Sequence, residues 1–174
     1  MTPRKHALTL GIHPTARGFG WVAFEGPFAP YDWGVMGAKG DKNAECLKKI
    51  VALVERFAPE VLVLEACSSL RSARSSRIGR LCKAIMSYAA DRGVEVAVYT
   101  RNDVRACFAS VGARTRYEIA EAVSRHVEAL RDRLPRQKKP WETEDRRYSI
   151  FAAAALVLTH YQRGAGRSWD ALAC

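Results

Sequence analysis

The stretch "ALTLGIHPTARGFGWVAFEG" (Ala7–Gly26) decides the fold expected for this chain. Its first half is an apolar run that ends in glycine, a polar loop with Pro14 and Gly18 follows, and a second apolar run spans Phe19–Phe24. This order predicts a β-hairpin. His13 stands directly after the first expected strand, where a chain often places a metal-binding carboxylate. The hairpin therefore opens either a site with an unusual ligand or a site that has lost its chemistry.

The rest of the chain predicts one more antiparallel strand and then strands that alternate with helices. Such an order is typical of an α/β fold with a mixed sheet, antiparallel in its first three strands and then parallel, and with helices on both faces. One domain is expected over residues 1–162, with a loosely ordered tail over residues 163–174. The expected strands are Trp33–Ala38, Glu60–Ala66 and residues 94–100, and the expected helices are residues 41–58, 69–92, 102–110, 115–133 and 144–162.

The composition narrows the class of protein. A length of 174 residues suits one domain, and no apolar run approaches the ~20 residues that span a membrane. The five cysteines are odd in number and form no CxxC pair, which disfavours zinc or disulfide frameworks and favours a reduced, cytoplasmic setting. The short basic N-terminus has no long apolar segment after it, so no secretory signal is expected. The net charge of +10 favours a polyanionic partner, most often nucleic acid, over a basic protein without one.

The basic residues are clustered. Four arginines recur at every third position near the start of the expected helix 69–92, a spacing that predicts a basic stripe rather than a salt-bridged face. Trp141 follows two lysines in a polar loop, where it either stacks on bases or packs in the protein. The expected nucleic-acid-binding residues are Arg71, Arg74, Arg77, Arg80, Arg101, Arg105, Arg114, Arg116, Lys138 and Lys139.

Four segments of the chain, taken in order, resemble the RuvC family of Holliday-junction resolvases in the RNase H-like superfamily. They are the opening hairpin "LGIHPTARGFGWVAFEG", the acidic strand and long helix within "FAPEVLVLEACSSLRSARSSRIGRLCKAIMSYAADRGVEVAVYT", the basic segment "RNDVRACFASVGARTRYEIAEAV" and the final helix "AAAALVLTHY". The resemblance covers about residues 7–162. It implies an RNase H-like mixed sheet, branched DNA as the partner, and a homodimer formed through the helix expected from Ser69.

The resemblance also implies a specific site. The family holds two Mg²⁺ ions with four acidic residues and uses them to cleave a phosphodiester bond. These positions fall on His13, Glu65, Ser149 and Ala152, so only Glu65 is acidic here. Because alanine cannot coordinate a metal ion, the resemblance with these replacements predicts lost or weak nuclease activity.

An active endonuclease with a rearranged site stays open as an alternative. Asp145 lies four residues before Ser149, so on the expected helix its carboxylate faces the same side one turn earlier. His13, Glu65 and Asp145 would then be the catalytic and metal-binding residues. A neutral imidazole suits Mn²⁺ or Zn²⁺ better than Mg²⁺. In the competing interpretation Asp145 only stabilises the helix N-terminus, and the protein has no metal cofactor.

Two further functions remain as hypotheses. A nucleotide-phosphate module of the actin and sugar-kinase type also opens with a glycine-rich hairpin, but it needs a second phosphate hairpin, which the sequence lacks. A scaffold whose basic surface binds an acidic protein is also compatible with the charge, and competition by DNA separates it from a nucleic-acid-binding protein.

Overall fold

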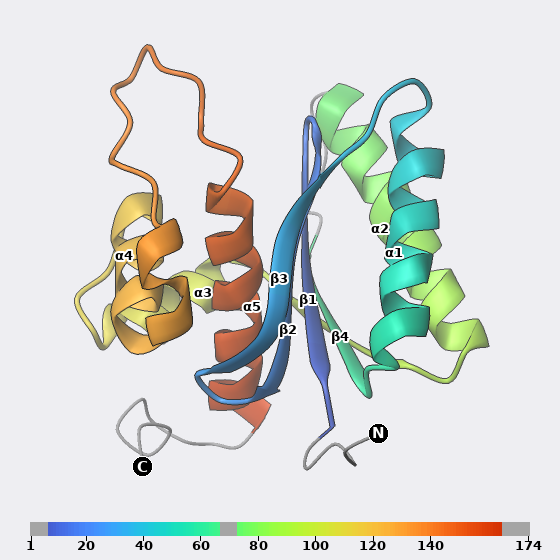
Figure 1. Ribbon diagram of the computed structural model, residues 1–174, viewed down its shortest axis with the longest axis horizontal. Coiled ribbons are helices and arrows are strands. Elements are labelled where there is room, and N and C mark those ends of the chain that lie inside the picture. Colours follow the sequence, from blue (N-terminus) through green and yellow to red (C-terminus); the bar gives the residue numbers. More distant parts are fainter. Residues whose placement is uncertain (1–6, 67–72, 165–174) are drawn as a thin grey trace.

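The computed structural model describes residues 7–66 and 73–164, and it contains one five-stranded sheet in the order β3-β2-β1-β4-β5. β1, β2 and β3 are antiparallel, whereas β1, β4 and β5 run parallel, which confirms the predicted mixed sheet (Figure 1). The strands are β1 (Thr9–Thr15), β2 (Gly18–Gly26), β3 (Ala29–Gly37), β4 (Val61–Glu65) and β5 (Glu95–Tyr99).

Helices cover both faces of the sheet (Figure 1). α1 and α2 pack on each other over one face, while α5 lies against β1 and β2 on the other face and contacts α3 and α4. The helices are α1 (Lys42–Phe57), α2 (Ala73–Asp91), α3 (Arg101–Ala109), α4 (Arg116–His126) and α5 (Tyr148–Gly164), with a 3₁₀ helix η1 (Glu128–Arg133) after α4. None of these helices is both long enough and apolar enough to cross a lipid bilayer.

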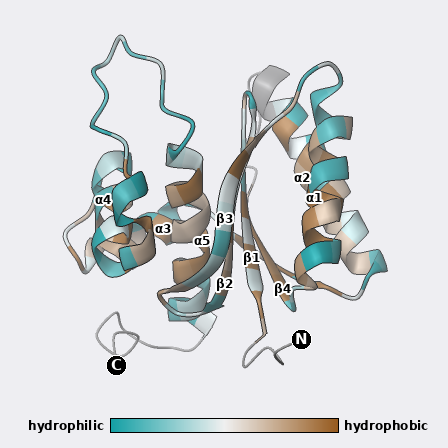
Figure 2. Cartoon of the chain, in the orientation of Figure 1, coloured by the Kyte–Doolittle hydropathy of each residue, from teal (hydrophilic) through white to brown (hydrophobic). Residues whose placement is uncertain are grey.

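The core is divided between the two faces because successive strand residues point to opposite sides. Leu10 and Ile12 of β1 pack with Ile50 of α1 on one side of the sheet, whereas Val22 of β2 packs with Phe151 of α5 on the other. Figure 2 shows hydrophobic residues, coloured brown, in the strands and in the helices that pack on them. The alternation in the hairpin thus supports both layers of helices.

Two glycines allow α5 to approach the hairpin closely. A Cβ atom at Gly11 would lie 2.6 Å from Val157 Cγ2 and 2.7 Å from the Ala153 carbonyl oxygen. A Cβ atom at Gly20 would overlap Ser149. Since Gly20 pairs with His13 across β1 and β2, this contact holds the first turn of α5 beside His13.

Several predicted boundaries are wrong. The last helix begins at Tyr148 rather than Glu144, because the Asp145 carboxylate accepts a hydrogen bond from the Arg147 backbone N–H (2.9 Å) in a turn before the helix. α4 ends at His126, so only η1 continues toward Arg133. The expected tail loses its first two residues to α5, and its remainder lies outside the described residues.

Candidate nucleic-acid interface

His13 and Glu65 meet at one edge of the sheet. β1 and β4 are adjacent parallel strands in which Ile12 pairs with Leu64, so the residues that follow lie side by side. His13 Nδ1 is 3.5 Å from Glu65 Oε2. The expectation that these two residues approach each other is confirmed.

His13 is neutral at physiological pH. Burial lowers its pKa from 6.5 to about 4, and this effect outweighs the attraction of the Glu65 carboxylate. The positive charges of Arg116 and Arg101 lower the pKa further. The contact between His13 and Glu65 is therefore one between an uncharged imidazole and a carboxylate.

A guanidinium group holds the other oxygen of Glu65. Arg101 Nε donates to Glu65 Oε1 at 2.9 Å. Arg101 is the first residue of α3, and Thr100 fixes this helix start by accepting from the Asp103 backbone N–H while the Asp103 carboxylate accepts from the Thr100 N–H. Because Arg101 is 78% exposed and Glu65 22% exposed, the ion pair forms the rim of the site.

A cavity of about 150 Å³ opens beside this ion pair, between the strand ends and helices α3, α4 and α5. Its walls are mostly apolar side chains, and, among the residues that the structure describes, its charged groups are one glutamate and three arginines. The lining residues are His13, Glu65, Arg101, Val104, Arg105, Arg116, Ile119, Ala120, Tyr148, Phe151, Ala152, Ala155 and Leu156.

The other positions of the expected acidic set do not provide metal ligands here. Ala152 presents only a methyl group to the cavity. Ser149 is buried against Gly20, and its hydroxyl donates to the Arg146 carbonyl oxygen (2.6 Å).

Asp145 does not lie on α5 and does not line the cavity. Its carboxylate accepts from the Arg147 guanidinium at 2.7 Å, and this hydrogen bond lowers the pKa of Asp145. In residues 7–66 and 73–164, no three His, Cys, Asp or Glu side chains form a group that could hold a metal ion. The expected cluster of His13, Glu65 and Asp145 is therefore not assembled, and the residues do not fit a pair of Mg²⁺ ions.

The structure brings three of the predicted binding residues together. Arg101 and Arg105 of α3 and Arg116 of α4 all line the cavity. Arg116 also forms an ion pair with Glu144 (2.9 Å), which ties α4 to the segment before α5. Arg114 is exposed in the loop that precedes α4. The three arginines that line the cavity, hereafter the arginine rim, lie beside the ends of β1 and β4.

The predicted arginine stripe on α2 is not continuous. The guanidinium of Arg77 donates to Asn43 Oδ1 and to the Thr15 carbonyl oxygen, both at 2.9 Å, so Arg77 joins α2 to α1 and β1. Arg80 is exposed and lines a separate groove between α2 and β5. Arg71 and the side chain of Arg74 lie outside the described residues.

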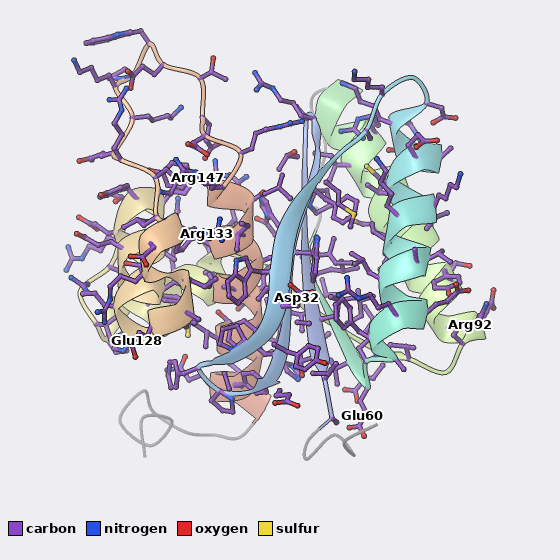
Figure 3. All side chains as sticks on the ribbon, viewed as in Figure 1. Asp32, Glu60, Arg92, Glu128, Arg133 and Arg147 are labelled. Carbon is purple, nitrogen blue, oxygen red and sulfur yellow. The ribbon has the colours of Figure 1, made fainter. Side chains whose placement is uncertain are left out.

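Sequence reasoning did not single out three residues around the start of α5. Arg146 packs against Gly37 at the end of β3, and Arg147 lies at the N-terminal end of α5, where Figure 3 labels it. Tyr148 lines the cavity directly. The adjacent pair of arginines in "EDRRY", just before an alanine-rich helix, was the available signal.

Comparison with known proteins identifies the fold. No protein-family model and no curated protein sequence matches the chain. Among solved structures, Thermus thermophilus RuvC in complex with a Holliday-junction substrate is similar with a TM-score of 0.67 and 18% identity, over 91% of this chain and 96% of that one.

A second structure of T. thermophilus RuvC is similar with a TM-score of 0.66 and 22% identity, again over 91% of this chain and 96% of that one. The yeast mitochondrial Holliday-junction resolvase Ydc2 is similar with a TM-score of 0.62 and 16% identity, over 99% of this chain and 84% of that one. The predicted RuvC-like, RNase H-like fold is confirmed.

Proposed function

From this RuvC-like fold, we propose that the protein binds branched DNA without efficient metal-dependent cleavage. T. thermophilus RuvC, which has a similar fold, has been solved in complex with a Holliday-junction substrate. The net charge of +10 supports a polyanionic partner of the same class. The fold and the charge thus agree on DNA as the ligand.

The charge of the cavity is the observation that supports the absence of efficient metal-dependent cleavage. In the described part of the chain, three arginines and one glutamate line it, and His13 is neutral. Two divalent cations held close together need several carboxylates to offset their repulsion, and a single carboxylate bound to a guanidinium does not supply them. A surface with excess guanidinium groups attracts phosphate instead.

The arginines of the rim suit the DNA backbone. Arg101 is 78% exposed and Arg116 58% exposed, so both can exchange their present carboxylate partners for phosphate oxygens at little cost in stability. Guanidinium groups bind phosphate through paired N–H donors. We infer that this rim contacts the sugar-phosphate backbone of the strands that meet at a branch point.

A binding and cleavage assay on the full chain tests the proposal. Fluorescence anisotropy with a labelled four-way junction and a linear duplex should give salt-dependent binding, and the double variant Arg105→Ala/Arg116→Ala should flatten the dependence of log K on log salt by about 1.8. Incubation with Mg²⁺ or Mn²⁺ should leave the junction uncut. Arg92→Ala, at the position that follows the C-terminal end of α2, serves as the control.

Three outcomes contradict the proposal. Robust cleavage that Glu65→Gln abolishes would make the protein a metal-dependent endonuclease with a rearranged site. Cleavage of the junction that is stronger in Mn²⁺ than in Mg²⁺ would assign His13 as a metal ligand. Absence of DNA binding, with an acidic protein bound instead, would make the basic surface a protein-interaction scaffold.

A further inference from the structure

The segment between η1 and α5 (residues 134–147) projects from the body of the protein (Figure 1). Trp141 lies in this loop and is 78% exposed. Of the large hydrophobic side chains that the structure describes as exposed, it is the most exposed, ahead of Tyr31 at 54%. The interpretation of Trp141 as a packing residue is therefore wrong.

The turn that carries Trp141 is held by Glu142. The Glu142 carboxylate accepts from the Lys139 backbone N–H (2.9 Å) and from the Arg136 guanidinium (2.6 Å), and the Glu142 N–H donates to the Lys139 carbonyl oxygen (3.0 Å). The hydrogen bond from Lys139 is the main reason that the pKa of Glu142 is lowered. The turn is thus ordered before any ligand binds, which reduces the entropy lost on binding.

The surroundings of the indole ring are basic. Lys139 Nζ lies 5.5 Å from the centroid of the Trp141 ring, within the range of a cation–π contact, and Lys138 is exposed beside it. Figure 2 colours most of this loop hydrophilic. An exposed aromatic ring beside lysine ammonium groups matches a nucleobase and its flanking phosphates, because every base offers a π-face next to a negative charge.

The loop is also connected to the rim of the cavity. Glu144, near the end of the loop, pairs with Arg116 at 2.9 Å. The Tyr148 hydroxyl donates to the Arg136 carbonyl oxygen (3.3 Å), and Tyr148 itself lines the cavity. A nucleic acid bound to the arginine rim therefore passes close to the base of this loop.

We propose that Trp141 stacks on an unstacked nucleobase at the branch point of the bound DNA, while Lys138 and Lys139 contact its flanking phosphates. This inference rests on the proposed function. Intact duplex offers no free base face except at its ends, so the contact distinguishes branched or unpaired DNA from duplex. Trp141 thus provides structure selectivity, whereas the arginine rim provides general affinity.

Binding measurements with Trp141→Ala and the conservative variant Trp141→Phe test the inference. Trp141→Ala should weaken binding to a four-way junction about tenfold and leave duplex binding and both salt slopes unchanged, whereas Trp141→Phe should retain most of the junction affinity. A junction with 2-aminopurine at the branch point should lose the fluorescence quenching caused by the parent protein when Trp141 is alanine. Since the side chain is exposed, both variants should keep the parent's circular dichroism spectrum.

The outcomes separate the two proposals. Equal loss of junction and duplex affinity in Trp141→Ala, or no loss at all, overturns the stacking role while DNA binding by the protein stands. If the parent protein binds neither DNA, the proposed function itself fails. Unaltered DNA binding combined with loss of a protein partner would assign Trp141 to a protein interface and refute the inference.

Discussion

Replacing Glu65 by glutamine should strengthen DNA binding. The change removes the one negative charge among the described residues that line the cavity and releases Arg101, whose Nε lies 2.9 Å from Glu65 Oε1. In an active two-metal nuclease the same change also removes a metal ligand and abolishes cleavage of the junction. The two interpretations of the site therefore differ in whether Glu65→Gln removes a cleavage activity as well as changing the affinity for DNA.

The size of the effect follows from Coulomb's law. A phosphate about 8 Å from the carboxylate is repelled by about 0.5 kcal/mol in bulk water and by about 2 kcal/mol at an effective dielectric constant of about 20. These limits correspond to a tightening of roughly two- to thirtyfold. If Arg101 gains a phosphate contact, the slope of log K against log salt should also steepen by about 0.9. Loss of the exposed ion pair should lower the free energy of unfolding by less than about 1 kcal/mol.

Fluorescence anisotropy with a four-way junction, repeated at several salt concentrations, measures both quantities. Glu55→Gln is the matched control, since Glu55 pairs with Arg92 at 3.5 Å on the exposed side of α1 and makes the same change in net charge away from the cavity. Screening beyond about 8–10 Å should limit the control to a small effect. Weaker binding by Glu65→Gln, or equal gains in the two variants, would refute the electrostatic reasoning.

Three other predictions test the description of the site and its supports. Ser149→Asp should lower the free energy of unfolding by about 3 kcal/mol or more because it buries a carboxylate against β2. Ala152→Asp, whose side chain faces the arginines, should lower it by less than about 1 kcal/mol. Urea denaturation of both variants measures the difference, and equal losses would contradict the assigned orientations. The His13 pKa of about 4 lies below the value of 6.5 in the unfolded chain, so the native state binds fewer protons between these pH values and stability should fall as the pH decreases from 6.5 to 4. Relative to His13→Gln, the parent should lose about 3 kcal/mol of unfolding free energy over that window. Parallel pH profiles of the two proteins would show that His13 is not buried in its neutral form. Arg77→Ala should destabilise the fold by about 2 kcal/mol because it removes the hydrogen bonds to Asn43 and Thr15. Arg80→Ala, at an exposed position, should change the free energy of unfolding by less than about 0.5 kcal/mol in the same thermal or urea measurement. The reverse order would indicate that Arg77 belongs to the exposed arginine stripe.

Much of the fold and part of the site were predictable from local patterns. The hairpin at residues 7–26 follows from two apolar runs around a short polar turn, and the N-caps Asp41 and Thr115 are visible as polar residues before helical periodicity. The approach of His13 to Glu65 follows from the ends of two parallel strands that flank one another. The replacement of an expected acid by Ala152 needs no structure at all, since a methyl group has no lone pair to donate.

Only the tertiary structure decided what the charged groups do. Arg77 belonged to a regular spacing, yet its partners come from β1 and α1. Burial of His13 likewise depends on elements that are distant along the chain. Periodicity and capping act within a few residues and are legible in the sequence, whereas ion pairs, desolvation and exposure depend on which distant segments the fold brings into contact.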